Sequence, residues 1–324
     1  MENNHILFAA GIGEDCLKRQ LLDDEVSQAI RDRTKVWVHL DALNPNTEKW
    51  LKSELKDVDP IVRGALLAGE TRPRALESGK GVLLILRGVN LNVNADPEDM
   101  VSIRLWIDEH RIISAQRRNL KAVKDIQQQC LNGKGPADIG DFVVRLTGRL
   151  FERMEPVMVE LDERTDNIEE LILENPSVEE RQQIVDIRKQ AIILRRYIVP
   201  QRDVMNFLRN CDLPWMSSIH KRHIQENLER ITRYVEDLDA IRERAQIVKD
   251  ELANILADRM NKNMYQLSVV AAIFLPLGFL TGLFGINLAG IPGAEYPYAF
   301  AIFAILLTVI VGVQIVVMKK LKWF

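Results

Sequence analysis

Residues 263–294 have the sequence NMYQLSVVAAIFLPLGFLTGLFGINLAGIPGA, and residues 296–318 have the sequence YPYAFAIFAILLTVIVGVQIVVM. Neither stretch contains a charged side chain, and Glu295 is the one charge between them. Each stretch is long and apolar enough to cross a bilayer as a helix, which takes about 20 residues. The sequence therefore predicts two C-terminal transmembrane helices, at about residues 265–285 and 297–318, joined by an outer loop at about residues 286–296.

Basic residues lie at the outer ends of these two stretches in the sequence, before the first and after the second. Arg259 and Lys262 precede the first stretch, Lys319, Lys320 and Lys322 follow the second, and the loop between them has no Lys or Arg. Because positively charged flanks stay on the cytoplasmic side, we expect a multi-pass protein with both termini in the cytoplasm.

The remainder of the chain excludes several classes of function. The formal net charge is −3, and such a mildly acidic protein is not expected to bind nucleic acid. Three cysteines without a CxxC pair predict no disulfide framework and a reducing compartment. The sequence has no phosphate loop, no HExxH motif and no nucleophile triad, so we predict neither an enzyme nor a bound cofactor.

The first 136 residues alternate between strand-like and helix-like patterns. Short apolar runs rich in β-branched residues predict strands at residues 6–9, 36–40, 82–86, 102–107 and 111–114. Helical patterns occupy residues 48–55 and 61–67, the second of them after Asp59-Pro60. Interleaved strands and helices predict an N-terminal α/β cytoplasmic domain over residues 1–136.

After Pro136 the pattern is helical. One helix is predicted over residues 138–174, and a second runs from Ser177 toward Arg209 with a kink or interruption at Pro200. No Pro or Gly occurs between Ser218 and Leu275, so a third helix continues to Phe284 over ~100 Å. The fold class is therefore an α+β membrane protein, with a cytoplasmic helical stalk at residues 137–262 and a transmembrane domain at residues 263–324.

The third helix carries an apolar stripe with three- and four-residue steps. A seam of this kind favours a coiled stalk made by several subunits, and the alternative is a helical hairpin within one chain. Two spans alone do not enclose a pore, which also favours an oligomer. The stripe comprises Leu228, Ile231, Val235, Leu238, Ala245, Val248, Leu252 and Ile255.

The chemistry of the predicted spans points to a hydrated ion. Neither span contains Asp, Glu, His or Cys, whereas bare zinc favours imidazole or thiolate and bare magnesium favours carboxylates. A ring of Asn287 amides and Gly285 carbonyls, with Ile286 between them, would hydrogen-bond the water shell of the ion at the outer mouth. The alternative is a small-residue packing face that ends in a Gly/Asn helix cap.

Two further predictions extend this site. A ring of Glu295 would concentrate cations at the mouth, unless Glu295 is only a solvated loop charge. The helix face below Asn287 would line the pore, with hydrophobic constrictions that gate by dewetting, unless its residues only form the coiled seam. This face consists of Met264, Leu267, Ala271, Leu275, Gly278 and Gly282.

The run Thr281-Gly282-Leu283-Phe284-Gly285-Ile286-Asn287 resembles the motif with which CorA-type divalent-cation transporters end their first span. The family has Gly-Met-Asn where this chain has Gly-Ile-Asn, and the variant is similar to the ZntB branch of the family. Four other runs are similar to that branch: residues 69–74, 195–203, 213–216 and 290–293.

The resemblance implies a homopentameric funnel in the bacterial cell inner membrane that transports zinc, with proton-linked uptake favoured. A CorA-like magnesium, cobalt or nickel carrier stays open as the alternative. A different class is a membrane-anchored scaffold or sensor, for which the sequence of the turn would not matter.

Outside the spans, Cys211, His220 and His223 are candidates for a cytoplasmic zinc site. His220 and His223 are one helical turn apart, but they bracket Lys221-Arg222, which repels cations, and a solvated pair is favoured. A second group of residues is predicted to pair with stalk carboxylates, namely Arg72, Arg74, Arg195, Arg196 and Arg202.

Overall fold

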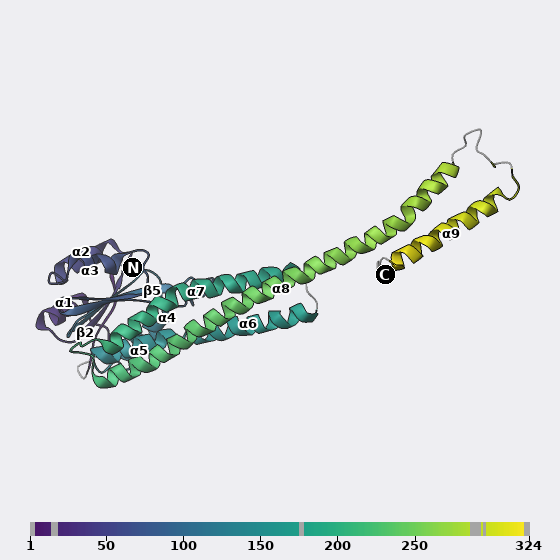
Figure 1. Cartoon of the computed structure of the whole chain (residues 1–324). Helices are drawn as coiled ribbons and strands as arrows, with labels where there is room; N and C mark the ends of the chain where they lie inside the picture. Colours follow the sequence, from purple (N-terminus) through teal and green to yellow (C-terminus); the bar gives the residue numbers. More distant parts are fainter. Residues whose placement is uncertain (1–3, 14–18, 175–177, 286–292, 294–295, 321–324) are drawn as a thin grey trace. The chain divides into compact units, whose positions relative to one another are not determined.

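The structure, a computed structural model, describes residues 4–13, 19–174, 178–285, 293 and 296–320. The chain forms two compact units, Met1–Lys249 and Asp250–Phe324, which are described separately (Figure 1). The predicted three-part division at residues 136 and 262 stays a prediction.

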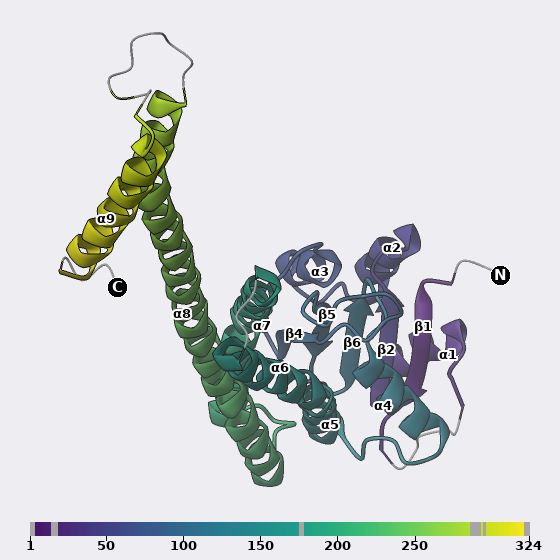
Figure 2. The same ribbon diagram turned by 90° about the vertical axis from the view of Figure 1, so that its right-hand side faces the viewer.

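Within its described residues, the first unit contains a six-stranded mixed sheet. The strands are β1 (Ile6–Gly11), β2 (Val36–Asp41), β3 (Arg74–Ser78), β4 (Gly81–Gly88), β5 (Val101–Ile107) and β6 (Arg111–Gln116). Their order is β1-β2-β6-β5-β4-β3, and Figure 2 shows β1, β2, β6, β5 and β4 side by side. β2 and β6 are parallel, whereas the other neighbours are antiparallel. All five predicted strands are confirmed, including the hairpin of β5 and β6.

Helices cover both faces of the sheet (Figure 1). One face packs its apolar cluster against α1 (Asp23–Asp32), α2 (Pro45–Glu54) and α3 (Pro60–Leu67). The other face lies toward α4 (Lys121–Leu131) and α5 (Ile139–Glu152), where the rings of Trp37 and Phe142 meet edge to face with centroids 4.8 Å apart. The predicted α/β layer domain is thus confirmed.

The two predicted helices of this domain begin at side-chain caps. The Asn44 side chain accepts a hydrogen bond from the Asn46 amide at 2.9 Å, and Pro45 occupies the first turn of α2. Asp59 caps α3 in the same way through the Ile61 amide at 2.7 Å, with Pro60 following it. Such caps satisfy backbone donors that the first turn of a helix leaves free.

The helix predicted over residues 138–174 is instead two helices, α5 and α6 (Glu155–Glu174). The break lies at Arg153 and Met154. Arg153 forms an ion pair with Asp125 of α4 at 2.6 Å, and Met154 is fully buried. Pro156 follows in the first turn of α6, where a proline is tolerated, whereas in one continuous helix it would lack a donor for the Glu152 carbonyl and clash with it. The proline and these tertiary contacts together account for the break.

The next helix, α7 (Val178–Asn210), contains Pro200 without an interruption. The predicted interruption at Pro200 is therefore wrong, and the alternative, a kink, stays a prediction. The adjacent Gln201 is fully buried, and its side chain accepts from the Arg87 backbone amide at 2.6 Å and donates to the Arg87 carbonyl at 3.0 Å. These bonds attach the helix to β4 next to the proline.

The third long helix, α8 (Ser218–Phe284), has the predicted bounds and 67 residues. Its apolar stripe is buried within one chain as far as Leu252. In the same region Asn227 donates to the Thr147 hydroxyl at 3.0 Å, and the Tyr234 hydroxyl donates to the Phe151 carbonyl at 3.2 Å. The predicted seam between subunits is thus wrong for this part of α8, because helices of the same chain cover it.

Candidate functional site

The second unit contains the membrane-spanning elements. The final part of α8 and α9 (Ala299–Lys320) both include stretches long and apolar enough to cross a membrane. Between residues 263 and 285 and between residues 296 and 318 there is no Asp, Glu, Lys, Arg, His or Cys. The strongest polar side chains of the described spans are therefore amides and hydroxyls.

The face of the first span that is predicted to line a pore is uncovered in the single chain. Leu267 and Leu275 are each 71% exposed, and Met264 is 60% exposed. Ala271 is exposed as well, and a Cβ added at Gly278 or Gly282 would meet nothing within 4 Å. Other apolar side chains of this helix, such as Phe274, are exposed too. Apolar side chains are thus exposed on more than one face of the first span, so exposure alone does not single out the predicted pore face.

The hydroxyl groups of the spans bind their own helices. Thr281 donates to the Leu277 carbonyl at 2.9 Å, Ser268 to the Met264 carbonyl at 2.9 Å, and Thr308 to the Ala304 carbonyl at 2.9 Å. Pro276 lies inside α8 and has no backbone N–H to donate, so the polar groups available along this segment are backbone carbonyls and hydroxyl oxygens. Such oxygens can accept hydrogen bonds from the water shell of an ion.

The helix end requires a glycine. The Gly285 amide donates to the Thr281 carbonyl at 2.9 Å, and a Cβ at Gly285 would lie 2.8 Å from that same oxygen. Any side chain there would displace the last turn of the span. The other predicted residues of the outer mouth, Ile286, Asn287 and Glu295, lie outside the described residues.

The candidate cytoplasmic zinc site is not assembled. Cys211 is buried, its thiol donates to the Leu208 carbonyl at 3.1 Å, and burial raises the pKa of that thiol. His220 accepts from the Ser217 amide through Nδ1 at 3.2 Å, and its Nε2 lies 3.4 Å from Asp138. His223 is exposed and lies 3.5 Å from Glu226. No three His, Cys, Asp or Glu side chains gather into a metal-binding group anywhere in the described part of the chain.

One of the arginines predicted to pair with stalk carboxylates does so across two helices. Arg195 of α7 binds Asp239 of α8 at 2.7 Å. Arg202 lies 3.6 Å from the adjacent Asp203, and Arg196 stacks on the Tyr197 ring at 5.1 Å. Arg72 and Arg74 form no ion pair with any residue that the structure describes.

Two stalk contacts were not predicted. Arg244 of α8 binds Asp162, Asp166 and Glu169 of α6, and this hydrogen-bonded cluster raises the pKa of its guanidinium. The three acidic residues follow the helical period, which was the available signal. The role of Gln201 depends on a strand that is remote in the sequence, although Gln201 belongs to a run that resembles the ZntB branch.

Comparisons with known proteins agree with this arrangement. A family described as CorA-like Mg2+ transporter protein matches residues 32–320. The zinc transport protein ZntB of Pectobacterium atrosepticum is 39% identical over 287 residues, covering 89% of this chain and 87% of the relative.

Solved structures are similar over the whole chain. The full-length CmaX protein superposes with a TM-score of 0.84 and 32% identity, and 100% of each chain is covered. The CorA magnesium transporter of Methanocaldococcus jannaschii has a TM-score of 0.77 at 16% identity, covering 98% of this chain and 99% of the other, which shows a shared fold. The family match extends from the α/β domain through both spans, so the chain belongs to the CorA family of divalent-cation transporters, which are not enzymes.

Proposed function

We propose that five copies of this chain surround an axial pore that carries hydrated zinc across the bacterial inner membrane. The observation that carries the proposal is the first span, whose predicted pore face is uncovered and whose described part has no ligand stronger than an amide or a hydroxyl. One copy with two spans does not enclose a water-filled path. The name of the Pectobacterium relative supports zinc as the transported ion.

The water shell of the ion is held at the outer end of the span. Gly285 ends α8 where a side chain would collide with Thr281. In the sequence Asn287 follows two residues later, so a ring of its amides would stand just above the ring of helix ends. Amide and carbonyl dipoles oriented toward the axis stabilise a hydrated cation without removing its water. Glu295, in the same outer loop, adds negative charge that concentrates cations at the mouth.

Below the ring, the pore changes in width with the size of its side chains. Gly278, Gly282 and Ala271 leave open space, whereas Leu275, Leu267 and Met264 form apolar rings. Rings of this kind gate by dewetting. The gate opens when the helices move apart far enough for water to enter.

Electrical work favours inward movement into a cell that is negative inside. A divalent ion gains about 4.6 kcal/mol per 100 mV when it moves inward. The spans contain no carboxylate, so proton-linked uptake would use loop or cytoplasmic groups rather than a relay inside the membrane. Zinc flux into vesicles under separately imposed pH and voltage gradients tests direction and coupling.

The ring is tested by Asn287→Ala in proteoliposomes containing a zinc-responsive dye. We expect zinc flux to be abolished while the oligomer stays intact, because alanine has no group that binds the water shell. The matched control is Asn263→Ala, which also removes one amide but lies at the other end of the stretch. Undiminished zinc flux in Asn287→Ala would contradict the role of the Asn287 ring. A parent protein that is monomeric by native mass spectrometry would contradict the pore between subunits.

A magnesium carrier is the second candidate, because the matching family is described as a Mg2+ transporter. Zinc uptake measured against a large excess of magnesium separates the two. Persistent zinc uptake supports the zinc proposal, whereas its loss, or similar competition by cobalt or nickel, supports the broader carrier. A scaffold that only uses the spans as a tether would keep its function when residues 285–287 are scrambled.

A further inference from the structure

Three arginines lie on one face of the central sheet. Arg104 of β5 stands between Ile85 of β4 and Ala115 of β6, and both of these residues belong to the apolar cluster under α1, α2 and α3. Side chains alternate along a strand, so Arg87 and Arg117, two residues after Ile85 and Ala115, extend on the same face. An otherwise apolar face therefore ends in a group of three guanidinium groups.

Arg104 is fully buried, and most of its hydrogen-bonding capacity is unused. Its Nη2 donates to the Gly69 carbonyl at 2.8 Å. Its Nε and Nη1 are buried, and neither has a hydrogen-bond partner among the residues that the structure describes. Burial, together with the charges of Arg117 and Arg87, lowers the pKa of Arg104 to about 10, which still leaves it charged at neutral pH. A buried cation without a counter-charge is unfavourable, so an anion that binds beside Arg104 would stabilise it.

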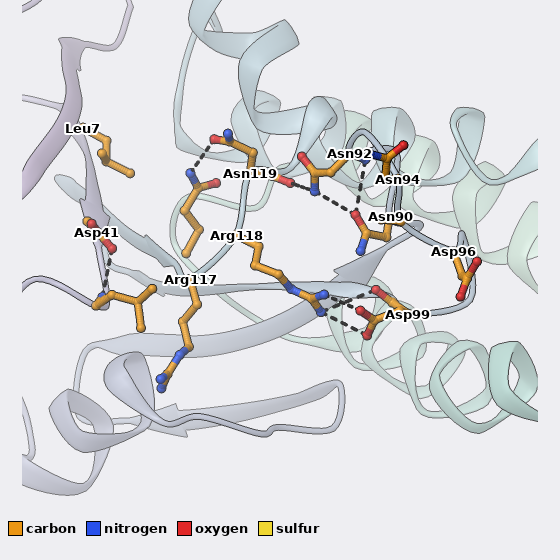
Figure 3. A pocket seen from close by; sticks show the side chains of 13 residues that line it. Leu7, Asp41, Asn90, Asn92, Asn94, Asp96, Asp99, Arg117, Arg118 and Asn119 are labelled. Carbon is orange, nitrogen blue, oxygen red and sulfur yellow. Dashed lines mark hydrogen bonds and ion pairs between the residues drawn. The ribbon is translucent and has the colours of Figure 1, made fainter.

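A cavity of about 290 Å³, here called the arginine cavity, adjoins these groups. Its lining includes Arg87, Arg104, Arg117 and Arg118, and its carboxylates are Glu70 and Asp99. Arg118 already binds Asp99, and Figure 3 shows Arg117 pointing away from that pair. The lining therefore keeps an excess of positive charge.

The other arginines differ in how firmly they are held. Arg87 is fixed by bonds from Nε to the Thr71 carbonyl at 3.0 Å and from Nη1 to the Met100 carbonyl at 2.8 Å, with the Tyr197 ring 4.1 Å from its guanidinium carbon. Arg117 is exposed, and its hydrogen bond to the Leu67 carbonyl is 3.4 Å long. Arg117 is thus the side chain that would move to let a ligand reach Arg104.

A second hollow of about 590 Å³ shares Leu43, Asp99, Arg117 and Arg118 with the arginine cavity. Its remaining lining is mainly amide side chains, among them Asn90, Asn92, Asn94 and Asn119, together with the carboxylates of Asp41 and Asp96 (Figure 3). It lies where the parallel strands β2 and β6 end, at Asp41 and Gln116. Clefts at the carboxyl ends of parallel strands are common ligand sites in α/β sheets. Uncharged hydroxyl-bearing groups would fit the amides of this hollow.

We propose that the arginine cavity binds a phosphate group, either as inorganic phosphate or as the phosphoryl end of a small hydroxylated phosphomonoester. Planar guanidinium groups bind oxyanions through paired N–H donors, and Arg104 has free N–H groups on two nitrogens. The bound anion supplies the missing counter-charge. This site is independent of the ion pathway in the second unit.

The test uses the full-length protein in detergent at constant ionic strength, with chloride replaced by phosphate. We expect phosphate to raise the melting temperature in a saturable manner and calorimetry to give binding of one phosphate per chain. Arg104→Met should weaken binding about tenfold or more, because it removes charge-assisted hydrogen bonds. Arg117→Met should also weaken binding. The control, Arg31→Met, removes an exposed arginine of α1 and should bind as the parent protein does.

A stability measurement separates loss of the site from loss of the fold. In phosphate-free buffer Arg104→Met should melt at or above the parent temperature, because methionine replaces an uncompensated buried charge. Glycerol phosphate that binds more tightly than inorganic phosphate would identify an ester as the ligand, and the reverse order would identify inorganic phosphate. Unchanged phosphate binding in Arg104→Met, equal binding of chloride, or no binding to the parent protein would overturn the proposal.

Discussion

The two units place their apolar side chains in opposite ways. In Met1–Lys249, Trp37 and Phe142 are fully buried against each other. In Asp250–Phe324, Leu275 is 71% exposed and Phe300 is 82% exposed. The first unit contains its own core, whereas the second presents an apolar surface that only a bilayer or other copies can cover. Stability in the first unit should therefore respond to single side chains, and in the second to its surroundings.

The test with the largest expected effect replaces one phenylalanine by alanine in each unit. Phe142→Ala should lower the free energy of unfolding by about 3–5 kcal/mol, because it leaves a cavity under Trp37. Phe279→Ala should change it by less than about 1 kcal/mol, because Phe279 is exposed and lipid or detergent replaces its contacts. Denaturation of the full-length protein followed by tryptophan fluorescence measures both values. Equal losses would show that the second unit has a core of its own.

Much of the first unit was predictable from the sequence, and the elements that were not predicted are β3, α1 and α4. The five predicted strands are buried runs of β-branched and apolar residues, whereas the missed β3 is mostly exposed and has no such run. The missed helix α1 buries only Val26 and Ile30, so its apolar period is short. β3 and α1 bury too little to show a continuous apolar face. The helix α4 was also not predicted, although it buries such a face through Ala122, Val123, Ile126 and Cys130.

The candidate site shows a different limit. The course of α8 from Ser218 to Leu275 followed from the absence of Pro and Gly, but the identity of its neighbours did not. A helical stripe indicates that a surface is covered, and it does not state whether the same chain or another copy covers it. The stripe as far as Leu252 is in fact buried within the single chain. Arg104 was overlooked for a related reason, because one arginine in an apolar strand looks like an exception until its neighbours Arg87 and Arg117 are placed beside it.

The second test concerns how each unit satisfies the hydrogen bonds of its buried backbone groups. Apart from the carbonyl that Pro276 leaves without a donor, the interior backbone groups of the spans are satisfied within each helix. In contrast, β4 extends past its last pairing with β3, at Ile85 and Arg74, and depends on Gln201 there. Gln201→Leu should lower the free energy of unfolding by about 2–4 kcal/mol, because the Arg87 amide and carbonyl lose their partners. Gln182→Leu, on the exposed surface of the same helix, is the control and should change it little. Similar losses in the two variants would mean that the Gln201 amide contributes only by its size.

The third test uses pH, to which the charge-free spans should not respond. His39 is fully buried, its Nδ1 lies 2.8 Å from the Ser114 hydroxyl, and burial lowers its pKa to about 4. The unfolded histidine has a pKa near 6.5, so between pH 6.5 and 4 the unfolded state binds more protons. The first unit should therefore be fully stable above pH 6.5 and lose stability as the pH falls through this window.

At pH 5 the expected loss from His39 is about 2 kcal/mol relative to pH 7.5. Urea denaturation at a series of pH values, compared between the parent protein and His39→Gln, isolates this contribution. The variant should be less stable at pH 7.5 and should show a flatter profile between pH 5 and 6.5. An unchanged slope would assign the pH dependence to other groups.

The smallest expected effect concerns the charged contact between α6 and α8. Arg244 is about one-third exposed, as is Glu169, while Asp162 and Asp166 are more exposed, so solvent weakens each ion pair. Arg244→Met should lower the free energy of unfolding by about 1 kcal/mol, and added salt should reduce the difference from the parent protein. Arg222→Met, at an exposed position of α8, should have no comparable effect. A loss of the same size in high salt would mean that Arg244 stabilises the stalk through the packing of its aliphatic part, and the contrast between the units would then rest on apolar contacts alone.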